Sequence, residues 1–221
     1  MLCHGRSPDW DRAGDFQDRI ARAAGAHLTA PMDVIGHSFG ATVAVRVAAL
    51  FPERVRSLTL IESVYFAGVG RDQPHLLEAE QADAALFRDA VLAGQLEEAA
   101  RIFNSGWGNA DGPAWDTLPE ASRAAMARGV QIVPACGASI IEDCHGMLEP
   151  GGLNRIACPV LLLRGDQTAE IIAEVNAGLQ RRLPNARSEV IQGTGHMAPI
   201  SHPEATAAHI RRFWQDVPAA S

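Results

Sequence analysis

The sequence predicts an α/β protein: an open parallel sheet with flanking helices, interrupted by a helical insertion. Three observations predict this class. Short apolar runs alternate with helix-length segments at both ends of the 221-residue chain, the middle offers helices but no convincing pair of strands, and a Gly-x-Ser-x-Gly motif joins a strand to a helix. We therefore expect an α/β core made of residues 1–66 and 151–221, and an insertion made of residues 67–150.

The first core segment contains a helix, a strand, a second helix and a second strand. We expect them at Phe16–Ala24, Met32–Gly36, Gly40–Phe51 and Val55–Ile61. Gly25 and Pro52 end the two helices, because glycine is a common helix stop and proline cannot continue a helix. Strand, helix and strand in this order are typical of neighbouring parallel strands.

The insertion is expected to be helical, with segments at Leu76–Ala93, Gln95–Phe103 and Pro119–Arg128. A helical insertion in an α/β protein is often a lid over a functional site, and the alternative is an elaboration with no gating role. The aromatic side chains of the insertion allow two interpretations as well. They either line an apolar substrate pocket or form the packed interior of the insertion, and they are Phe87, Phe103, Trp107 and Trp115.

The second core segment returns to the alternating pattern. We expect a strand at Pro159–Leu163, a helix at Ala169–Leu183, a strand at Arg187–Ile191 and a final helix at Pro203–Trp214. Together the two core segments supply the strands of one parallel sheet.

Charge and composition exclude several classes of function. The net charge is −7, from 26 acidic and 19 basic residues, which argues against binding nucleic acid or a membrane surface because both need a basic face. All the basic residues are arginines, so a lysine Schiff base and a P-loop are excluded. The sequence has no apolar stretch of membrane-spanning length and no secretory signal at its start, so we expect a cytoplasmic protein.

The four cysteines indicate reduced, structural thiols. Cys3, Cys136, Cys144 and Cys158 form no Cys-x-x-Cys pair. Cys144 and His145 are adjacent, but no second pair has the spacing of metal ligands, so we expect no metal site.

The motif Gly36–Gly40, Gly-His-Ser-Phe-Gly, predicts a nucleophilic serine. It follows an apolar strand and opens an alanine-rich helix, which is the setting that this motif needs. Ser38 then lies on a strained turn that lifts its hydroxyl above the sheet, and the backbone N–H of Phe39 points at a developing oxyanion. His37 lies inside the turn, where we expect it to fill space and contact the substrate rather than act as the base. Trp107 is the second expected substrate contact.

The base that a serine nucleophile needs is best supplied by His196. It lies in Gly-Thr-Gly-His, directly after the last expected strand and before the last helix. Sites of α/β proteins assemble in loops at the carboxyl ends of parallel strands, so His196 reaches Ser38 through the fold.

These residues resemble the α/β-hydrolase fold superfamily, of the esterase, lactonase and C–C hydrolase type. The resemblance rests on Gly36–Gly40, on Pro159–Gly165 and on Gly193–His196, and it covers nearly the whole chain from His4 onward. It implies a catalytic triad in the chain order serine, acid, histidine.

The resemblance leaves the triad acid open between two main carboxylates, with Glu170 as a remote third choice. Relatives usually carry the acid three residues after the glycine that ends the penultimate strand, but Thr168 occupies that position. Asp166 directly follows that glycine, whereas Glu62 follows the second strand, where some dehalogenases of the superfamily carry their acid. Both strands end on the rim that holds Ser38, so either carboxylate is a candidate to orient His196.

The resemblance also implies that the first strands of the fold would precede this sequence. His4–Pro8 resembles a segment that follows the fourth strand of relatives, so we expect an N-terminally incomplete sheet that lacks the loop carrying the second oxyanion N–H. Phe39 is then the one recognisable oxyanion donor. The strand Met32–Gly36 becomes an apolar edge, which invites pairing with a second copy of the chain as a homodimer.

We therefore expect a serine hydrolase that needs no cofactor and acts on a small carboxylic ester, thioester or lactone through an acyl-enzyme. Its partner is a small-molecule substrate. Two alternatives stay open: a truncated, weakly active or inactive relative that serves as a binding protein, and a C–C hydrolase or perhydrolase that uses the same side chains.

Overall fold

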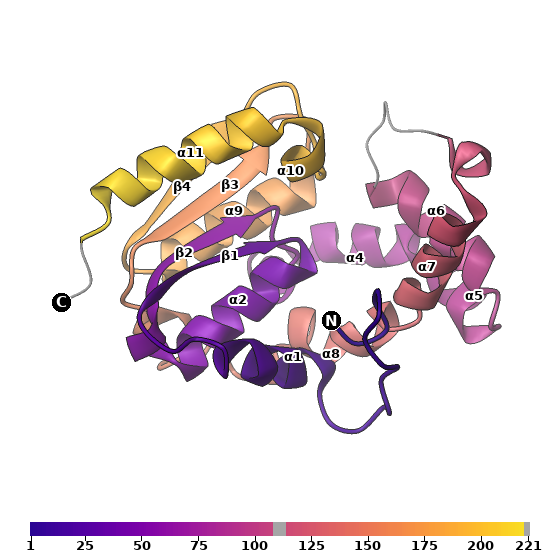
Figure 1. The fold of residues 1–221 in the computed structure, drawn as a ribbon, viewed down its shortest axis with the longest axis horizontal. Helices are drawn as coiled ribbons and strands as arrows, with labels where there is room; N and C mark the ends of the chain where they lie inside the picture. The colour runs from indigo at the N-terminus through magenta and orange to yellow at the C-terminus, as the bar shows by residue number, and fades with distance from the viewer. Residues whose placement is uncertain (108–113, 219–221) are drawn as a thin grey trace.

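The computed structural model describes residues 1–107 and 114–218. At its centre lies a sheet of four strands in the order β1-β2-β3-β4 (Figure 1). The strands are β1 (Met32–His37), β2 (Val55–Ile61), β3 (Val160–Gly165) and β4 (Ala186–Ile191), and every neighbouring pair is parallel. The open parallel sheet expected from the sequence is confirmed, and each expected strand is present within one or two residues of its predicted bounds.

Helices cover both faces of the sheet (Figure 1). On one face lie α1 (Phe16–Gly25), α2 (Phe39–Leu50) and α9 (Glu170–Arg182), and on the other lies α11 (Pro203–Asp216). Each face has its own hydrophobic cluster, so the sheet is the shared wall between two layers of apolar packing.

The double cover explains why the first four residues of β3 are all apolar. Val160 and Leu162 belong to the cluster under α1, α2 and α9, whereas Leu161 and Leu163 belong to the cluster under α11. All four side chains are fully buried. Because successive strand residues point to opposite faces, a stretch of strand covered on both faces favours apolar side chains at consecutive positions.

The outer edge of β1 is less protected. Within residues 1–107 and 114–218, β1 pairs with β2 alone, and Met32 and Ile35 are exposed apolar side chains. Asp33 faces β2, where it pairs with Arg56 and accepts a hydrogen bond from the hydroxyl of Ser57. The homodimer through this edge stays a prediction.

The insertion is helical, and among its described residues it contains no strand. Its helices are α3 (Ala67–Asp72), α4 (Pro74–Asp83), α5 (Ala85–Leu92), α6 (Leu96–Trp107), α7 (Glu120–Val130) and α8 (Gly137–Ile140). The insertion also has short 3₁₀ turns at Trp115–Thr117 and Val133–Cys136. In the core, similar turns lie at Pro52–Arg54 and Leu153–Arg155, and the short helix α10 (Ala198–Ser201) precedes α11. Of the described helices, none has both the length and the apolar character that crossing a membrane requires.

The single helix expected over Leu76–Ala93 is wrong, because the chain breaks at Ala84. This residue has a ψ of −2°, which interrupts the α-helical ladder between α4 and α5. The break separates a surface helix from an interior one. None of the residues of α4 is buried, whereas α5 contributes Phe87 and Ala90 to a hydrophobic cluster inside the insertion.

That cluster also decides between the two interpretations of the aromatic side chains. Phe87 is buried in it, and Phe103 and Trp115 pack against it, so these three form the interior of the insertion. Trp107 differs, because it packs against the larger cluster of the core.

Candidate active site

Ser38 lies in the turn between β1 and α2. Its φ of 55° and ψ of −124° place a residue other than glycine in a strained backbone conformation. A Cβ at Gly36 would overlap the carbonyl oxygen of Gly40, so glycine at position 36 lets the strand and the helix approach. A Cβ at Gly40 would meet nothing within 4 Å. The structure therefore contains the strained serine turn that the motif predicts. The strand and the helix come closest at Gly36, and not at Gly40.

His196 lies in the loop between β4 and α10, directly against Ser38. Its Nε2 lies 2.9 Å from Ser38 Oγ, and its Nδ1 lies 3.1 Å from Glu62 Oε2. Ser38, Glu62 and His196 follow β1, β2 and β4, and the carboxyl ends of parallel strands meet at one edge of a sheet. The fold thus joins three distant residues in one hydrogen-bonded chain.

The Glu62 carboxylate is fully buried and contacts three donors. The backbone N–H of Gly165 donates to Oε1 at 2.6 Å, and the hydroxyl of Thr168 donates to Oε2 at 2.6 Å, the same oxygen that faces His196. Glu62 also has a φ of 50°, so a second strained residue follows the end of β2. With both oxygens engaged, the carboxylate is fixed in one orientation toward the imidazole.

Asp166, the other candidate acid, is exposed and makes different contacts. Its Oδ1 accepts the backbone N–H of Gly193 at 2.8 Å and that of Thr194 at 3.3 Å. The carboxylate therefore closes the turn that precedes His196. The structure brings Glu62, rather than Asp166, to the imidazole.

His37 is held by the backbone of His196. Its Nε2 donates to the carbonyl oxygen of His196 at 2.8 Å, which fixes the proton of the neutral ring on that nitrogen. Burial lowers the pKa of His37 and so favours the neutral form. His37 thus anchors the loop that carries the candidate base, and the substrate contact expected for it from the sequence stays a prediction.

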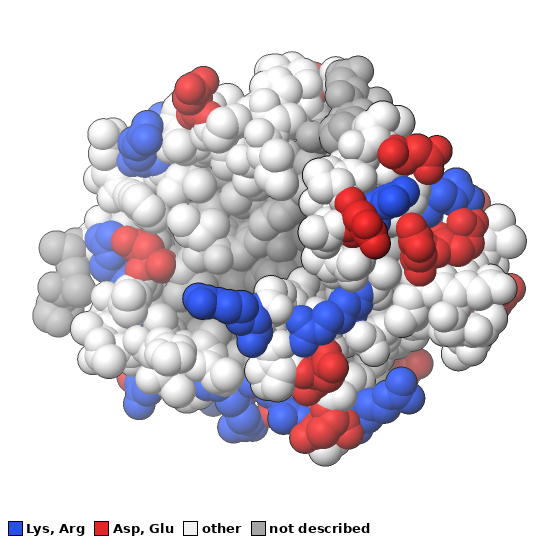
Figure 2. Space-filling view, turned by 45° about the vertical axis from the view of Figure 1, so that its right-hand side comes forward, with Lys and Arg blue, Asp and Glu red and all other residues white. Residues whose placement is uncertain are grey.

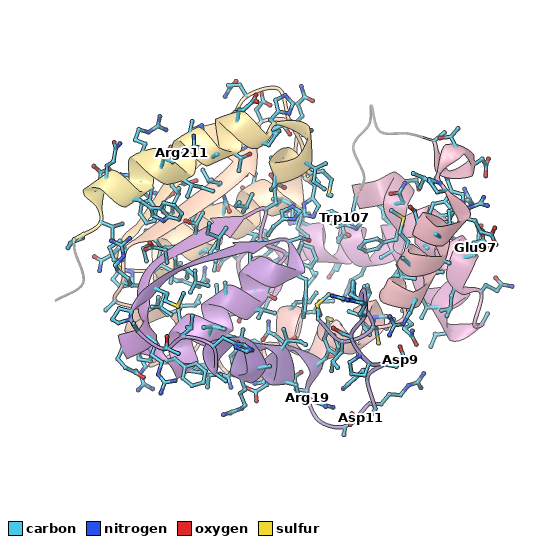
Figure 3. All side chains as sticks on the ribbon, in the orientation of Figure 1. Asp9, Asp11, Arg19, Glu97, Trp107 and Arg211 are labelled. Carbon is cyan, nitrogen blue, oxygen red and sulfur yellow. The ribbon has the colours of Figure 1, made fainter. Side chains whose placement is uncertain are left out.

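Trp107, the last residue of α6, brings the insertion to the site. The centroid of its ring lies 4.8 Å from that of His196 in an edge-to-face arrangement, and 6.3 Å from that of Phe66. Figure 3 shows Trp107 where the insertion faces the sheet, and Figure 2 shows a hollow near the middle of the molecule whose visible walls are mostly uncharged. The indole of Trp107 therefore gives the imidazole an apolar neighbour.

Comparison with known proteins decides the family. A family model described as "Alpha/beta hydrolase family" matches residues 1–209. The chain belongs to the alpha/beta hydrolase family. The resemblance drawn from the motifs is confirmed, and the protein is a hydrolase.

Curated relatives of this hydrolase are themselves hydrolases. It is 31% identical over 199 residues to the pimeloyl-[acyl-carrier protein] methyl ester esterase of Neisseria meningitidis serogroup B / serotype 15 (strain H44/76), covering 88% of this chain and 74% of that protein. It is 28% identical over 214 residues to the 2-(acetamidomethylene)succinate hydrolase of Mesorhizobium japonicum, covering 91% of this chain and 70% of that protein.

Solved structures share the fold. A bacterial membrane phospholipase A, described as a virulence factor, has a TM-score of 0.67 at 22% identity and covers 98% of this chain and 68% of its own. A bromoperoxidase from Bacillus anthracis has a TM-score of 0.68 at 17% identity and covers 97% of this chain and 79% of its own. At these identities the likeness concerns the fold alone.

The hydrolase presents the amino end of α2 beside Ser38. The first N–H groups of a helix have no partner inside it, and Phe39 is the first residue of α2. In the part of the chain that the structure describes, the N–H of Ser38 donates to Ile61 and that of Ala41 to Ser38, while the N–H of Phe39 has no backbone acceptor. The unpaired N–H and the positive end of the helix dipole both favour a negative charge at this position.

Sequence reasoning missed the two donors that hold Glu62. Gly165 contributes only a backbone N–H, which no residue pattern reveals. Thr168 did carry a signal, because it occupies the position where relatives carry their acid. A hydroxyl at that position leaves room for a carboxylate from the neighbouring strand and donates a hydrogen bond to it.

Proposed function

We propose that this hydrolase cleaves a small carboxylic ester through an acyl-enzyme formed on Ser38. The observation that supports this proposal most strongly is the position of His196, 2.9 Å from the hydroxyl of Ser38 and 3.1 Å from the carboxylate of Glu62. The relative that is 31% identical carries the name of a methyl ester esterase, which supports an ester rather than another hydrolysable bond.

In the proposed reaction, Ser38 Oγ attacks the carbonyl carbon while His196 Nε2 takes the hydroxyl proton. Glu62 accepts the hydrogen bond from Nδ1 and stabilises the imidazolium ion that forms. The backbone N–H of Phe39 donates to the oxyanion. The imidazolium then protonates the leaving alcohol, and a water activated by the same imidazole hydrolyses the acyl-enzyme. Each step uses groups of this chain, the substrate and water.

Thr168 acts in this scheme as a positioning residue. Its hydroxyl donates to the oxygen of Glu62 that faces His196, so it fixes the direction in which the carboxylate points. Gly165 holds the other oxygen. Because the carboxylate of Glu62 is fully buried, water cannot hydrogen-bond to it, and these two short hydrogen bonds take the place of that solvation.

The proposed substrate class follows from the surface beside the imidazole. The ring of Trp107 packs against the imidazole of His196, and the ring of Phe66 packs against that of Trp107. We therefore propose that the insertion acts as a lid that receives the hydrocarbon part of the ester. Thioesters and lactones present the same carbonyl group and belong to the same class.

Hydrolysis of p-nitrophenyl acetate and butyrate by the purified chain tests the proposal. Ser38→Ala and His196→Ala should each abolish turnover, and labelling by a fluorophosphonate should be lost in Ser38→Ala. His202→Ala is the matched control, because His202 is half-exposed, contacts Ser201 and lies outside the site. A folded chain whose turnover does not depend on Ser38 would overturn the proposal, and a folded chain without turnover would favour a binding protein.

A further inference from the structure

We propose that Asp15, Cys144 and His145 form a binding site for one divalent transition-metal ion of the Zn²⁺ type. One ligand atom from each residue lies within 4.8 Å of the other two. His145 Nε2 lies 3.0 Å from Asp15 Oδ1, and Cys144 Sγ lies 4.0 Å from Asp15 Oδ2. None of these residues contacts the site around Ser38, so the inference does not depend on the proposed function.

The three side chains supply the donor types that zinc prefers. Zinc binds sulfur at about 2.3 Å, imidazole nitrogen at about 2.0–2.1 Å and carboxylate oxygen at about 2.0–2.2 Å, usually in a tetrahedron. These lengths place tetrahedral ligand atoms roughly 3.3–3.6 Å apart. His145 lies 3.0 Å from one oxygen of Asp15 and Cys144 lies 4.0 Å from the other, so the carboxylate faces both ligands. Since the three ligand atoms lie within 4.8 Å of one another, side-chain rotations of about an ångström bring them to the spacing of one ion.

Accessibility also suits an ion that enters from solvent. The side chains of Asp15 and His145 are 20% and 14% exposed, so two ligands are largely shielded, whereas Cys144 is exposed. The exposed side leaves an approach for the ion and a fourth coordination position for water.

Asp15 is fixed before any ion binds. It is the N-cap residue of α1, and its Oδ1 accepts the backbone N–H of Asp18 at 2.7 Å. The carboxylate is therefore held by the helix and still faces His145.

The segment that carries the other two ligands is also fixed. Asp143, which has a φ of 51°, accepts the backbone N–H groups of Met147 and Leu148 and the hydroxyl of Tyr65. The backbone N–H of Cys144 donates to Ala138 at 2.9 Å. A segment tied on both sides of Cys144 and His145 presents them in a set geometry, and preorganised ligands bind an ion more tightly than mobile ones.

The charge balance is favourable. One carboxylate and one thiolate offset the two positive charges of the ion, and a neutral imidazole completes the set. Binding converts the thiol to a thiolate and releases its proton to solvent. The neighbouring cation Arg46 is paired with Asp18 at 2.8 Å, so its charge is already compensated.

From the sequence we expect no metal site, because the adjacent pair Cys144 and His145 has no second pair near it and the third ligand is remote in the chain. Cys144 and His145 lie 129 and 130 positions after Asp15. The site joins the start of α1 in the core to the segment that follows α8 at the end of the insertion (Figure 1). We therefore expect the ion to stabilise the attachment of the insertion to the core.

Cobalt titration of the untagged, chelator-treated chain tests the proposal, because Co²⁺ reports a thiolate ligand through a sulfur-to-metal absorption band. We expect one equivalent of Co²⁺ to produce this band, Zn²⁺ to displace it, and a slight excess of Zn²⁺ to raise Tm by several degrees. Cys144→Ser should lose the band and the rise in Tm. Cys158→Ser is the matched control and should keep both, because Cys158 is a half-buried free thiol elsewhere.

Asp15→Asn separates metal binding from helix capping. Asparagine caps a helix as well as aspartate but offers a neutral oxygen, so the metal-free Tm should change little while the affinity for Zn²⁺ falls at least tenfold. His145→Gln should weaken binding similarly, with the exposed His75→Gln as its control. A band that persists in Cys144→Ser, or metal-free and metal-treated chains with the same Tm and no band, would overturn the site in favour of a plain ion pair between Asp15 and His145.

Discussion

Replacing Glu62 with glutamine tests the proposed triad at its acid, the carboxylate that contacts the imidazole of His196. The two side chains have nearly the same shape, but only one end atom of the amide accepts a hydrogen bond. Gly165 donates to Oε1, so the amide oxygen takes that position and the NH₂ group lies at Oε2, facing Thr168 and His196. A donor there forces the imidazole proton onto Nε2, which then donates to Ser38 instead of accepting its proton.

The expected loss in kcat is roughly 10⁴-fold, the known cost of changing the triad aspartate of a serine protease to its amide. This factor corresponds to about 5.4 kcal/mol, at 1.36 kcal/mol per tenfold change. KM should change little, because Glu62 is fully buried behind His196. Tm should also change little, since the amide still pairs with the Gly165 N–H and with the hydroxyl of Thr168.

Steady-state hydrolysis of p-nitrophenyl butyrate measures the effect, with Asp166→Asn as the matched control. The control removes a carboxylate charge from the same rim but keeps an oxygen for Gly193, so its kcat should stay within about threefold. Adding Thr168→Asp to Glu62→Gln should recover at least tenfold, because position 168 already reaches the carboxylate. The reasoning is refuted if Glu62→Gln keeps kcat within tenfold of the parent, or if Asp166→Asn loses as much.

Three other changes test separate parts of the structure. Asp166→Ala should leave kcat within tenfold but lower Tm by roughly 2–4 °C in thermal unfolding, because the Gly193 turn loses an acceptor worth about 1 kcal/mol. Gly36→Ala should lower the free energy of unfolding by about 1–3 kcal/mol in a urea titration and reduce kcat, since its Cβ meets the backbone of Gly40; an unchanged midpoint would contradict the close approach. Burial lowers the pKa of His37, so the unfolded chain binds its proton more readily and Tm should fall as the pH drops through about 6.5. His37→Asn should flatten that part of the Tm profile, and a profile identical to the parent would contradict the assignment.

Much of the core could be predicted from the sequence because its signals are local. The apolar run of β3 reflects burial on both faces, and Pro52 marks the end of the helix that follows the serine turn. The break at Ala84 was not predictable in this way. Nothing in the residues around it opposes a helix, and the break follows from how α4 and α5 pack against different neighbours.

The candidate site also contains residues that the sequence predicts and a residue that it does not. The Gly36–Gly40 motif and the loop of His196 were recognisable, because each chemistry needs a particular residue type at a particular strand end. The choice between Glu62 and Asp166 was not, since both carboxylates follow strands that end on one rim. It depends on where the turn at Gly193 folds back, which draws Asp166 away and leaves the imidazole to Glu62. Only three-dimensional contacts carry that information.

The contact between Trp107 and His196 divides the labour of the enzyme between two parts of the chain. Ser38, Glu62 and His196 all follow strands of the sheet, whereas Trp107 ends a helix of the insertion. On the proposed mechanism, the proton path belongs to residues that follow strands of the sheet, and the apolar substrate contact belongs to a helix of the insertion. A substitution in α6 is therefore expected to change how the substrate fits while the hydrogen-bonded chain of Ser38, His196 and Glu62 stays in place.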